Sequence, residues 1–248
     1  TFWPGVLNKN YFCGQKMVLF QSNLETGRWL FRHRSFLPMV FYPLAVLVIF
    51  LDKGLLQSLP EHILAPLALL TSGMGVMVRM LVIGHVPRDT SGRNRKRQKA
   101  KSLNTKGVYS IVRHPLYLGN YLMWLGIIIY IGNIWFAIAC SLIFWLYYER
   151  IMYVEEEFLH EKFGDSYTNW AKDVPAFVPT FRQWKRPELP FAVRRAIRWE
   201  YRGIVATLVS MSFIYVLKHF ADLHQWHINK FWIGALIFSA VLYIVMRI

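Results

Sequence analysis

The sequence predicts an all-α, polytopic membrane protein with about six transmembrane helices, and two observations support this. Of the 248 residues, 55% are hydrophobic and 17% are aromatic. Four apolar stretches without charge are long enough, or nearly so, to cross a bilayer, which takes about 20 helical residues. A soluble chain of this size would not hold so many, so we expect the lipid bilayer to be a partner of the chain.

The six expected spans follow from the runs of apolar residues, taken in order along the chain. The first is short and contains two prolines, Pro38 and Pro43, which kink helices. Only Gly132 and Asn133 separate the third span from the fourth, so those two form a tight antiparallel hairpin. The expected spans are residues 36–51, 62–84, 116–132, 134–148, 203–220 and 231–248.

After the fourth span the apolar residues recur at mostly helical spacing. This pattern predicts that the span continues from residue 149 as an amphipathic cytoplasmic helix. The helix is expected to end at Phe163-Gly164, because glycine suits a helix C-cap. Residues 174–190 are rich in proline and are expected to be irregular.

The distribution of basic residues predicts the topology. Residues 85–113 carry nine Lys or Arg against the single acid Asp89, which places this loop in the cytoplasm by the positive-inside rule. Alternating the spans then places both termini and residues 149–202, which hold ten Lys or Arg, on the same side. Residues 1–20 lack the pattern of a signal peptide.

The formal net charge of +15 does not indicate a nucleic-acid partner, because no nucleic-acid-binding motif accompanies it. No GxGxxG or HExxH motif is present. His224 and His227 lie on the expected outer loop and are more typical of interfacial side chains than of a metal site. We therefore expect no metal.

The candidate site combines two clusters of polar residues. Arg113-His114-Pro115 opens the third span, and Glu155-Glu156 follows the cytoplasmic end of the fourth. The hairpin brings both to one membrane surface, where cations and carboxylates suit a zwitterionic ligand that carries a nucleoside. The alternative is an interfacial salt bridge that only fixes the two helices together.

The chain resembles the isoprenylcysteine carboxyl methyltransferase and phospholipid methyltransferase family of integral membrane enzymes. The resemblance covers roughly residues 62–180, and two motifs at the expected separation make it fairly specific. The segments that carry it are residues 105–109 (TKGVY), 113–119 (RHPLYLG), 155–159 (EEEFL) with Phe163-Gly164 and Tyr167, and 174–179 (VPAFVP).

The resemblance implies a methyltransferase that uses S-adenosyl-L-methionine, with a cofactor pocket open to the cytoplasm and an acceptor that enters from the bilayer. It implies a core over 62–180, between an N-terminal segment with the first span (1–61) and a basic segment with a hairpin (181–248). The implied cofactor residues are Tyr109, Val112, Arg113, His114, Pro115, Tyr117, Gly119, Glu155 and Glu156. Of these, Arg113 and Glu156 are the expected catalytic residues, and Arg79, Arg150 and Tyr153 are expected to bind the substrate.

The expected reaction is O-methylation of an anionic group, a carboxylate or a phosphate such as that of lipid A, on a membrane lipid or lipidated acceptor. Basic residues between 182 and 202 favour an anionic head group. Three alternatives remain: N-methylation of phosphatidylethanolamine, an NADPH-dependent sterol reductase-like activity, and a non-enzymatic membrane scaffold. The sequence does not define an oligomeric state.

Overall fold

The structure is a computed structural model that describes residues 24–34, 37–51, 59–87 and 100–248. The basic run at 93–99, Cys13 and most of the N-terminal segment lie outside these residues. Within them the chain forms helices and loops only. The predicted all-α class is therefore confirmed for the described part of the chain.

The described elements follow the expected order along the chain. Residues 24–33 are helical and precede the short 3-10 helix η1 (Leu37–Val40). Two further 3-10 helices are η3 (Gly107–Ser110) and η4 (Phe181–Gln183). The α-helices are α2 (Phe41–Leu51), α3 (Glu61–His85), α4 (Pro115–Ile131), α5 (Ile134–Phe163), α6 (Asp165–Asp173), α7 (Val193–Leu223) and α8 (Lys230–Arg247).

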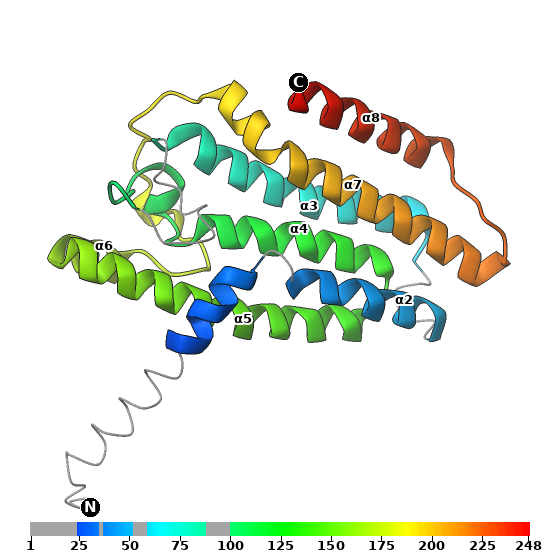
Figure 1. The fold of residues 1–248 in the computed structure, drawn as a ribbon, viewed down its shortest axis with the longest axis horizontal. Coiled ribbons are helices and arrows are strands. Elements are labelled where there is room, and N and C mark those ends of the chain that lie inside the picture. Colours follow the sequence, from blue (N-terminus) through cyan, green and yellow to red (C-terminus); the bar gives the residue numbers. More distant parts are fainter. Residues whose placement is uncertain (1–23, 35–36, 52–58, 88–99) are drawn as a thin grey trace, which may run out of the picture.

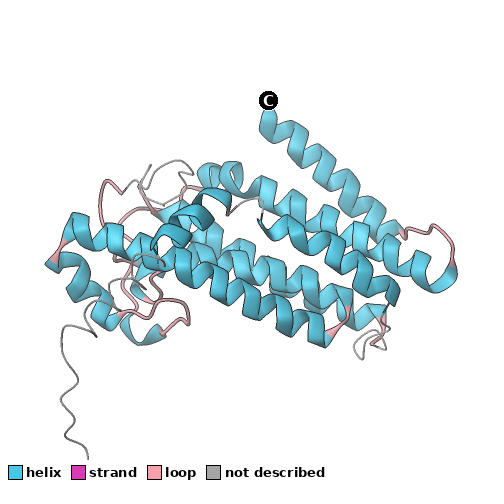
Figure 2. Ribbon diagram, turned by 60° about the horizontal axis from the view of Figure 1, so that its bottom comes forward, coloured by secondary structure: helices cyan, strands magenta, loops and turns pink. Residues whose placement is uncertain are grey.

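The long helices lie side by side along the length of the molecule (Figures 1 and 2). Helix α3 contacts both α4 and α7, and α8 packs on the outer side of α7. The largest cluster of buried side chains lies between these helices and α2, and it includes Leu64, Tyr130, Met211 and Trp232. A second, aromatic cluster joins the 24–33 helix to α4 and α5 through Phe31, Tyr117, Phe144 and Tyr148.

The predicted hairpin of α4 and α5 is present. Gly132 ends α4 with φ of 90°, a left-handed conformation that glycine adopts without a steric penalty. The Asn133 side chain then accepts a hydrogen bond of 2.8 Å from the Phe136 amide and caps α5. The chain thus reverses in two residues, which fixes the two helices as antiparallel neighbours.

Helix α5 continues without a break through the segment predicted to be amphipathic, to Phe163. Its 30 residues span about 45 Å, which exceeds the roughly 30 Å of a hydrocarbon core. Gly164, with φ of 54°, separates α5 from α6. The glycine-terminated end predicted at Phe163-Gly164 is confirmed.

By length and composition, four of the described helices are able to cross a membrane: α3, α5, α7 and α8. The other two expected spans, 36–51 and 116–132, correspond to the shorter apolar helices α2, with 11 residues, and α4, with 17. Six full spans are therefore not established.

Helix α7 begins at Val193, ten residues before the start predicted for the fifth span. The prediction missed this start because the segment carries several charged residues and so does not resemble a membrane span. In the structure these charges have partners. Arg195 donates to the carbonyls of Ile83 and Gly84 at the end of α3, at 3.0 and 2.8 Å, and Glu200 pairs with Arg79. These interactions with α3 allow charged residues to form the first turns of a long helix.

Candidate active site

The first part of the site is the segment that leads into α4. His114 is the N-cap of α4, and Pro115 occupies the first helical position, where its missing N–H has no partner to lose. The amides of Arg113 and His114 donate to the carbonyls of Pro175 and Ala176, at 2.9 and 3.1 Å. The loop after α6 therefore fixes the backbone from which both side chains project.

The Arg113-His114 cluster and the Glu155-Glu156 cluster are in contact, as predicted. His114 Nε2 lies 2.8 Å from Glu156 Oε1, and Arg113 Nη1 lies 3.4 Å from Glu156 Oε2. Because a carboxylate only accepts hydrogen bonds, His114 carries its proton on Nε2. The second imidazole nitrogen, Nδ1, faces Glu155 at 3.8 Å.

Tyr117 links the second carboxylate to the same cluster. Its hydroxyl donates to Glu155 Oε2 at 2.7 Å and accepts from Arg34 Nη1 at 3.2 Å. Its ring stacks on the His114 imidazole with the centroids 5.7 Å apart. Two carboxylates are thus surrounded by two arginines, an imidazole and a phenol, with His114 only 4% exposed.

Two buried donors beside this cluster form no hydrogen bond of good geometry among the described residues, Arg113 Nε and the Tyr167 hydroxyl on α6, although the hydroxyl lies near both the Glu156 carboxylate and the Arg113 guanidinium. Burial, and then the nearby Glu156 carboxylate, raise the pKa of Tyr167, so the phenol keeps its proton at neutral pH. Leaving a buried polar group unpaired costs about 1–3 kcal/mol. Both groups are therefore suited to bind a polar ligand.

Tyr109 and Val112 lie just before this cluster. Burial, and then the Glu155 carboxylate, raise the pKa of the Tyr109 phenol. The backbone carbonyl of Tyr109 accepts a hydrogen bond of 3.2 Å from the Trp170 side chain on α6. Val112 is fully buried, and Pro115 is buried beside it. These three predicted residues therefore line or support the same corner of the bundle.

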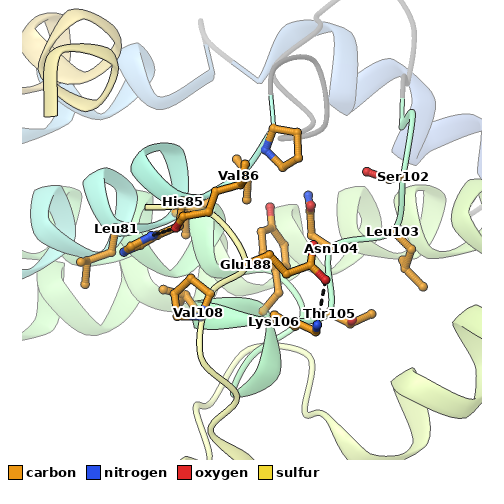
Figure 3. A pocket seen from close by; sticks show the side chains of 15 residues that line it. Leu81, His85, Val86, Ser102, Leu103, Asn104, Thr105, Lys106, Val108 and Glu188 are labelled. Atoms are coloured by element: carbon orange, nitrogen blue, oxygen red, sulfur yellow. Dashed lines mark hydrogen bonds and ion pairs between the residues drawn. The ribbon is translucent and has the colours of Figure 1, made fainter. Parts of the chain in front are cut away.

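Tyr109 also lines a pocket of about 100 Å³ at the end of α3 (Figure 3). Its walls come from residues 81–87, 102–109 and 187–189. Lys106 and Glu188 form an ion pair of 2.8 Å at its edge (Figure 3). Small-molecule sites enclose roughly 300–1,000 Å³, so this hollow adjoins the cluster but is too small to be a whole cofactor site.

Arg79 lies deeper in the bundle, and its donors are already engaged. It donates to both carboxylate oxygens of Glu200, from Nε at 2.7 Å and from Nη2 at 2.8 Å, and also to the Asn120 side chain. Gly119 lies directly against the Arg79 side chain, where a Cβ atom would clash with Arg79 Cγ. The structure thus places Gly119 against Arg79, rather than against His114.

Arg150 and Tyr153, predicted to bind the substrate, are not brought to the cluster. Both lie on an exposed side of α5, and Tyr153 is 39% exposed. Their assignment stays a prediction.

Four residues that the structure places in the cluster or in the contacts that lead to it were not predicted: Arg34, Asn120, Tyr167 and Glu200. Tyr167 belongs to one of the segments that carry the family resemblance. Glu200 is one of only two acids among residues 181–202, which is a visible but weak signal. Arg34 and Asn120 give no local signal in the sequence.

Comparison with known proteins identifies the family to which the chain is similar. Residues 63–166 match the family described as phospholipid methyltransferase. The chain is 38% identical over 84 residues to the protein-S-isoprenylcysteine O-methyltransferase of Schizosaccharomyces pombe, covering 34% of this chain and 36% of that protein. It is 37% identical over 112 residues to protein-S-isoprenylcysteine O-methyltransferase B of Arabidopsis thaliana, covering 40% and 56%.

A longer alignment joins the chain to protein-S-isoprenylcysteine O-methyltransferase A of Arabidopsis thaliana, at 31% identity over 152 residues, covering 56% of this chain and 73% of that protein. The chain thus spans between about a third and three quarters of the length of these three relatives. No solved structure matches it. On the longest alignment, the chain belongs to the family of the isoprenylcysteine O-methyltransferases.

Proposed function

We propose that the chain is a membrane methyltransferase that uses S-adenosyl-L-methionine to O-methylate an anionic group on a membrane lipid or a lipidated acceptor. The observation that carries the proposal is the contact of His114 and Arg113 with Glu156, beside Glu155. It brings groups of both signs to one corner, as a zwitterionic methyl donor requires. Family membership is the second support.

The residues of this corner fit such a cofactor. Arg113 Nε and the Tyr167 hydroxyl are buried donors that form no hydrogen bond of good geometry among the described residues, and they would bind a carboxylate or another acceptor group. Glu155 and Glu156 would accept hydrogen bonds from ribose hydroxyls or balance a positive charge. When bound, the cofactor supplies an electrophilic methyl group on a sulfonium.

The chain's own residues would act by binding and positioning. An anionic acceptor is already a nucleophile at neutral pH, so no side chain has to remove its proton. Arg113 and Glu156 would hold the donor in line with the acceptor, and the aromatic cluster around Tyr117 and Tyr148 would exclude water. This is why a site without a dedicated general base suits the reaction.

The topology that we propose keeps the cofactor side in the cytoplasm. It has six spans, the continuation of α5 as an amphipathic helix and both termini on the cytoplasmic side. The basic residues at the site end of the bundle support this orientation. The acceptor would enter from the bilayer, and its anionic group is a carboxylate or a phosphate, including the lipid A type.

The experiment that tests the proposal uses the purified full chain in lipid, with S-adenosylmethionine labelled in its methyl group. It is offered total lipid extracts and a farnesylated cysteine acceptor. We expect label in a base-labile methyl ester of the prenylated carboxylate, or in a methyl phosphodiester of a lipid. Label in methylated phosphatidylethanolamine would show N-methylation and would contradict O-methylation. The match to the phospholipid methyltransferase family is the reason to measure it.

Binding gives an independent measure. S-adenosylhomocysteine at 100 times its Kd should raise the free energy of unfolding by about 2.7 kcal/mol. Unchanged thermal stability together with no labelled product would favour the alternative of a non-enzymatic membrane scaffold. Oxidation of NADPH with a sterol would support a reductase instead.

A further inference from the structure

A buried ion pair joins α3 to α7, roughly 10 Å into the bundle from its site end. The two hydrogen bonds between Arg79 and Glu200 measure 2.7 and 2.8 Å, and the Glu200 side chain is only 1% exposed. Figure 1 shows α3 and α7 side by side along this region. Glu200 lies outside residues 63–166, which match the family.

Stability alone is a poor explanation for this pair. Burying two charges costs several kcal/mol per ion, and apolar residues of similar volume often stabilise a protein as well or better. The helices also have apolar contacts of their own, for example between Leu64, Ala68, Met211 and Ile214. Ionisable residues within membrane helices are commonly functional, which favours a role for the pair in orienting neighbouring groups.

Hydrogen bonds and ring contacts lead from the pair to the candidate site. Arg79 donates to Asn120 Oδ1, and Asn120 Nδ2 donates to the Tyr148 hydroxyl at 3.1 Å. The Tyr148 ring contacts the Tyr117 ring, with centroids 4.9 Å apart. The Tyr117 hydroxyl in turn donates to Glu155 at 2.7 Å.

The charge of Arg79 decides the orientation of this chain of contacts. A guanidinium only donates, so the Asn120 oxygen must face Arg79 and its amide nitrogen must face Tyr148. Glu200 holds the guanidinium by two parallel bonds, which fixes the direction of its remaining donor. Gly119 leaves the space through which the Arg79 side chain reaches Asn120.

We propose that Glu200 is a positioning residue of the site: through Arg79 and Asn120 it holds Tyr148 and Tyr117 in the arrangement that fixes Glu155. This proposal rests on the proposed function, because it assigns Glu155 to the cofactor. It also gives α7, which lies beyond the family match, a defined part in the reaction.

The test compares two variants with the wild-type chain in lipid. Glu200→Gln keeps the shape of the side chain and removes its charge. The double variant R79M/E200M removes the whole pair and replaces it with apolar side chains of similar length, so it should fold with a melting temperature near that of the wild type. Glu161→Gln makes the same charge change on the exposed end of α5 and serves as the control.

We expect both variants to raise the KM for S-adenosylmethionine and the Kd for S-adenosylhomocysteine at least fivefold, while Glu161→Gln changes neither. Glu200→Asp, which keeps the charge, should recover part of the loss. Wild-type KM and Kd in a folded R79M/E200M chain would overturn the proposal, and so would failure of both variants to fold. If the wild-type chain binds no S-adenosylhomocysteine, the proposed function itself fails.

Discussion

The hydrogen bonds between His114 and Glu156 and between Tyr117 and Glu155 set the geometry of the candidate site. All four side chains come from α5 or from α4 and its N-cap residue, and a two-residue turn joins these helices. Small changes in any of them would therefore alter the site without altering the fold. This makes single substitutions informative.

Replacing His114 or Glu156 by alanine should weaken binding of S-adenosylhomocysteine at least tenfold, about 1.4 kcal/mol. Each change removes one member of the 2.8 Å contact between His114 and Glu156, and the remaining side chain loses that hydrogen bond. Isothermal titration of the purified chain measures the loss. His224→Ala, at the far end of α7, should bind as the wild type does; wild-type affinity in both site variants would contradict the assignment.

Tyr167→Phe should stabilise the ligand-free chain and weaken ligand binding. The hydroxyl is buried and forms no hydrogen bond of good geometry among the described residues, so its removal relieves part of the cost of about 1–3 kcal/mol that an unpaired buried group carries. Thermal unfolding with and without S-adenosylhomocysteine measures both effects. Tyr147→Phe is the matched control, because its hydroxyl is also buried and unpartnered there; it should stabilise the chain without changing the response to the ligand.

At this scale, the sequence predicts the contact between the two clusters because a short turn between two apolar helices leaves little freedom. It does not predict the pairing of Arg79 with Glu200, which joins residues 121 positions apart. Nor does it predict Arg34, which reaches Tyr117 from the turn just after the 24–33 helix. Long-range partners of this kind have no local signal.

At the scale of elements, close packing of α3 on α4 depends on small residues. A Cβ atom on Gly126 would come within 3.0 Å of Ser72 and of the Ala68 carbonyl, and one on Gly75 would meet the Gly119 carbonyl at 2.5 Å. Ser72 Oγ also donates to the Met123 carbonyl at 2.9 Å. The two backbones therefore approach closely, as is common for membrane helices.

Gly126→Ala should destabilise the chain by about 1–3 kcal/mol, because the added methyl group meets backbone atoms that cannot move aside easily. Gly73→Ala is the control on the same pair of helices. A Cβ there meets nothing within 4 Å, and alanine in a helix is favoured over glycine by about 0.5–1 kcal/mol. Denaturation in detergent measures both; equal effects would argue against the close approach.

The helices themselves were predictable to different degrees. Runs of apolar residues and the Gly132-Asn133 turn define α4 and α5 within one or two residues. The start of α7 was missed because Arg194, Arg195, Arg198, Glu200 and Arg202 are typical of a loop. Their helical conformation depends partly on partners in α3, and such tertiary contacts override local patterns.

At the scale of the whole molecule, the site lies at one end of the bundle, and the links between α4 and α5 and between α7 and α8 lie at the other (Figure 1). Our topology places these ends on opposite sides of the membrane. A single cysteine at position 161 should then react with an impermeant maleimide from the cytoplasmic side, and one at position 225 from the opposite side.

This experiment uses a chain in which Cys13 and Cys140 are replaced by alanine, assayed in sealed vesicles of known orientation. Glu161→Cys and Gln225→Cys change exposed residues and should fold normally. Reaction of both from the same side would exclude the proposed arrangement. His62→Cys, near the start of α3, should behave as position 225 does.

The hydrogen bonds from Arg113 and His114 to Pro175 and Ala176 have a consequence for biosynthesis. The ribosome releases the segment that opens α4 some sixty residues before the loop after α6, whose carbonyl groups hold that segment in place. When α3, α4 and α5 have been synthesised, the segment that opens α4 therefore still lacks the two backbone hydrogen bonds that fix it. A newly made chain gains its final shape there only after α6 has left the exit tunnel and the following loop has folded back.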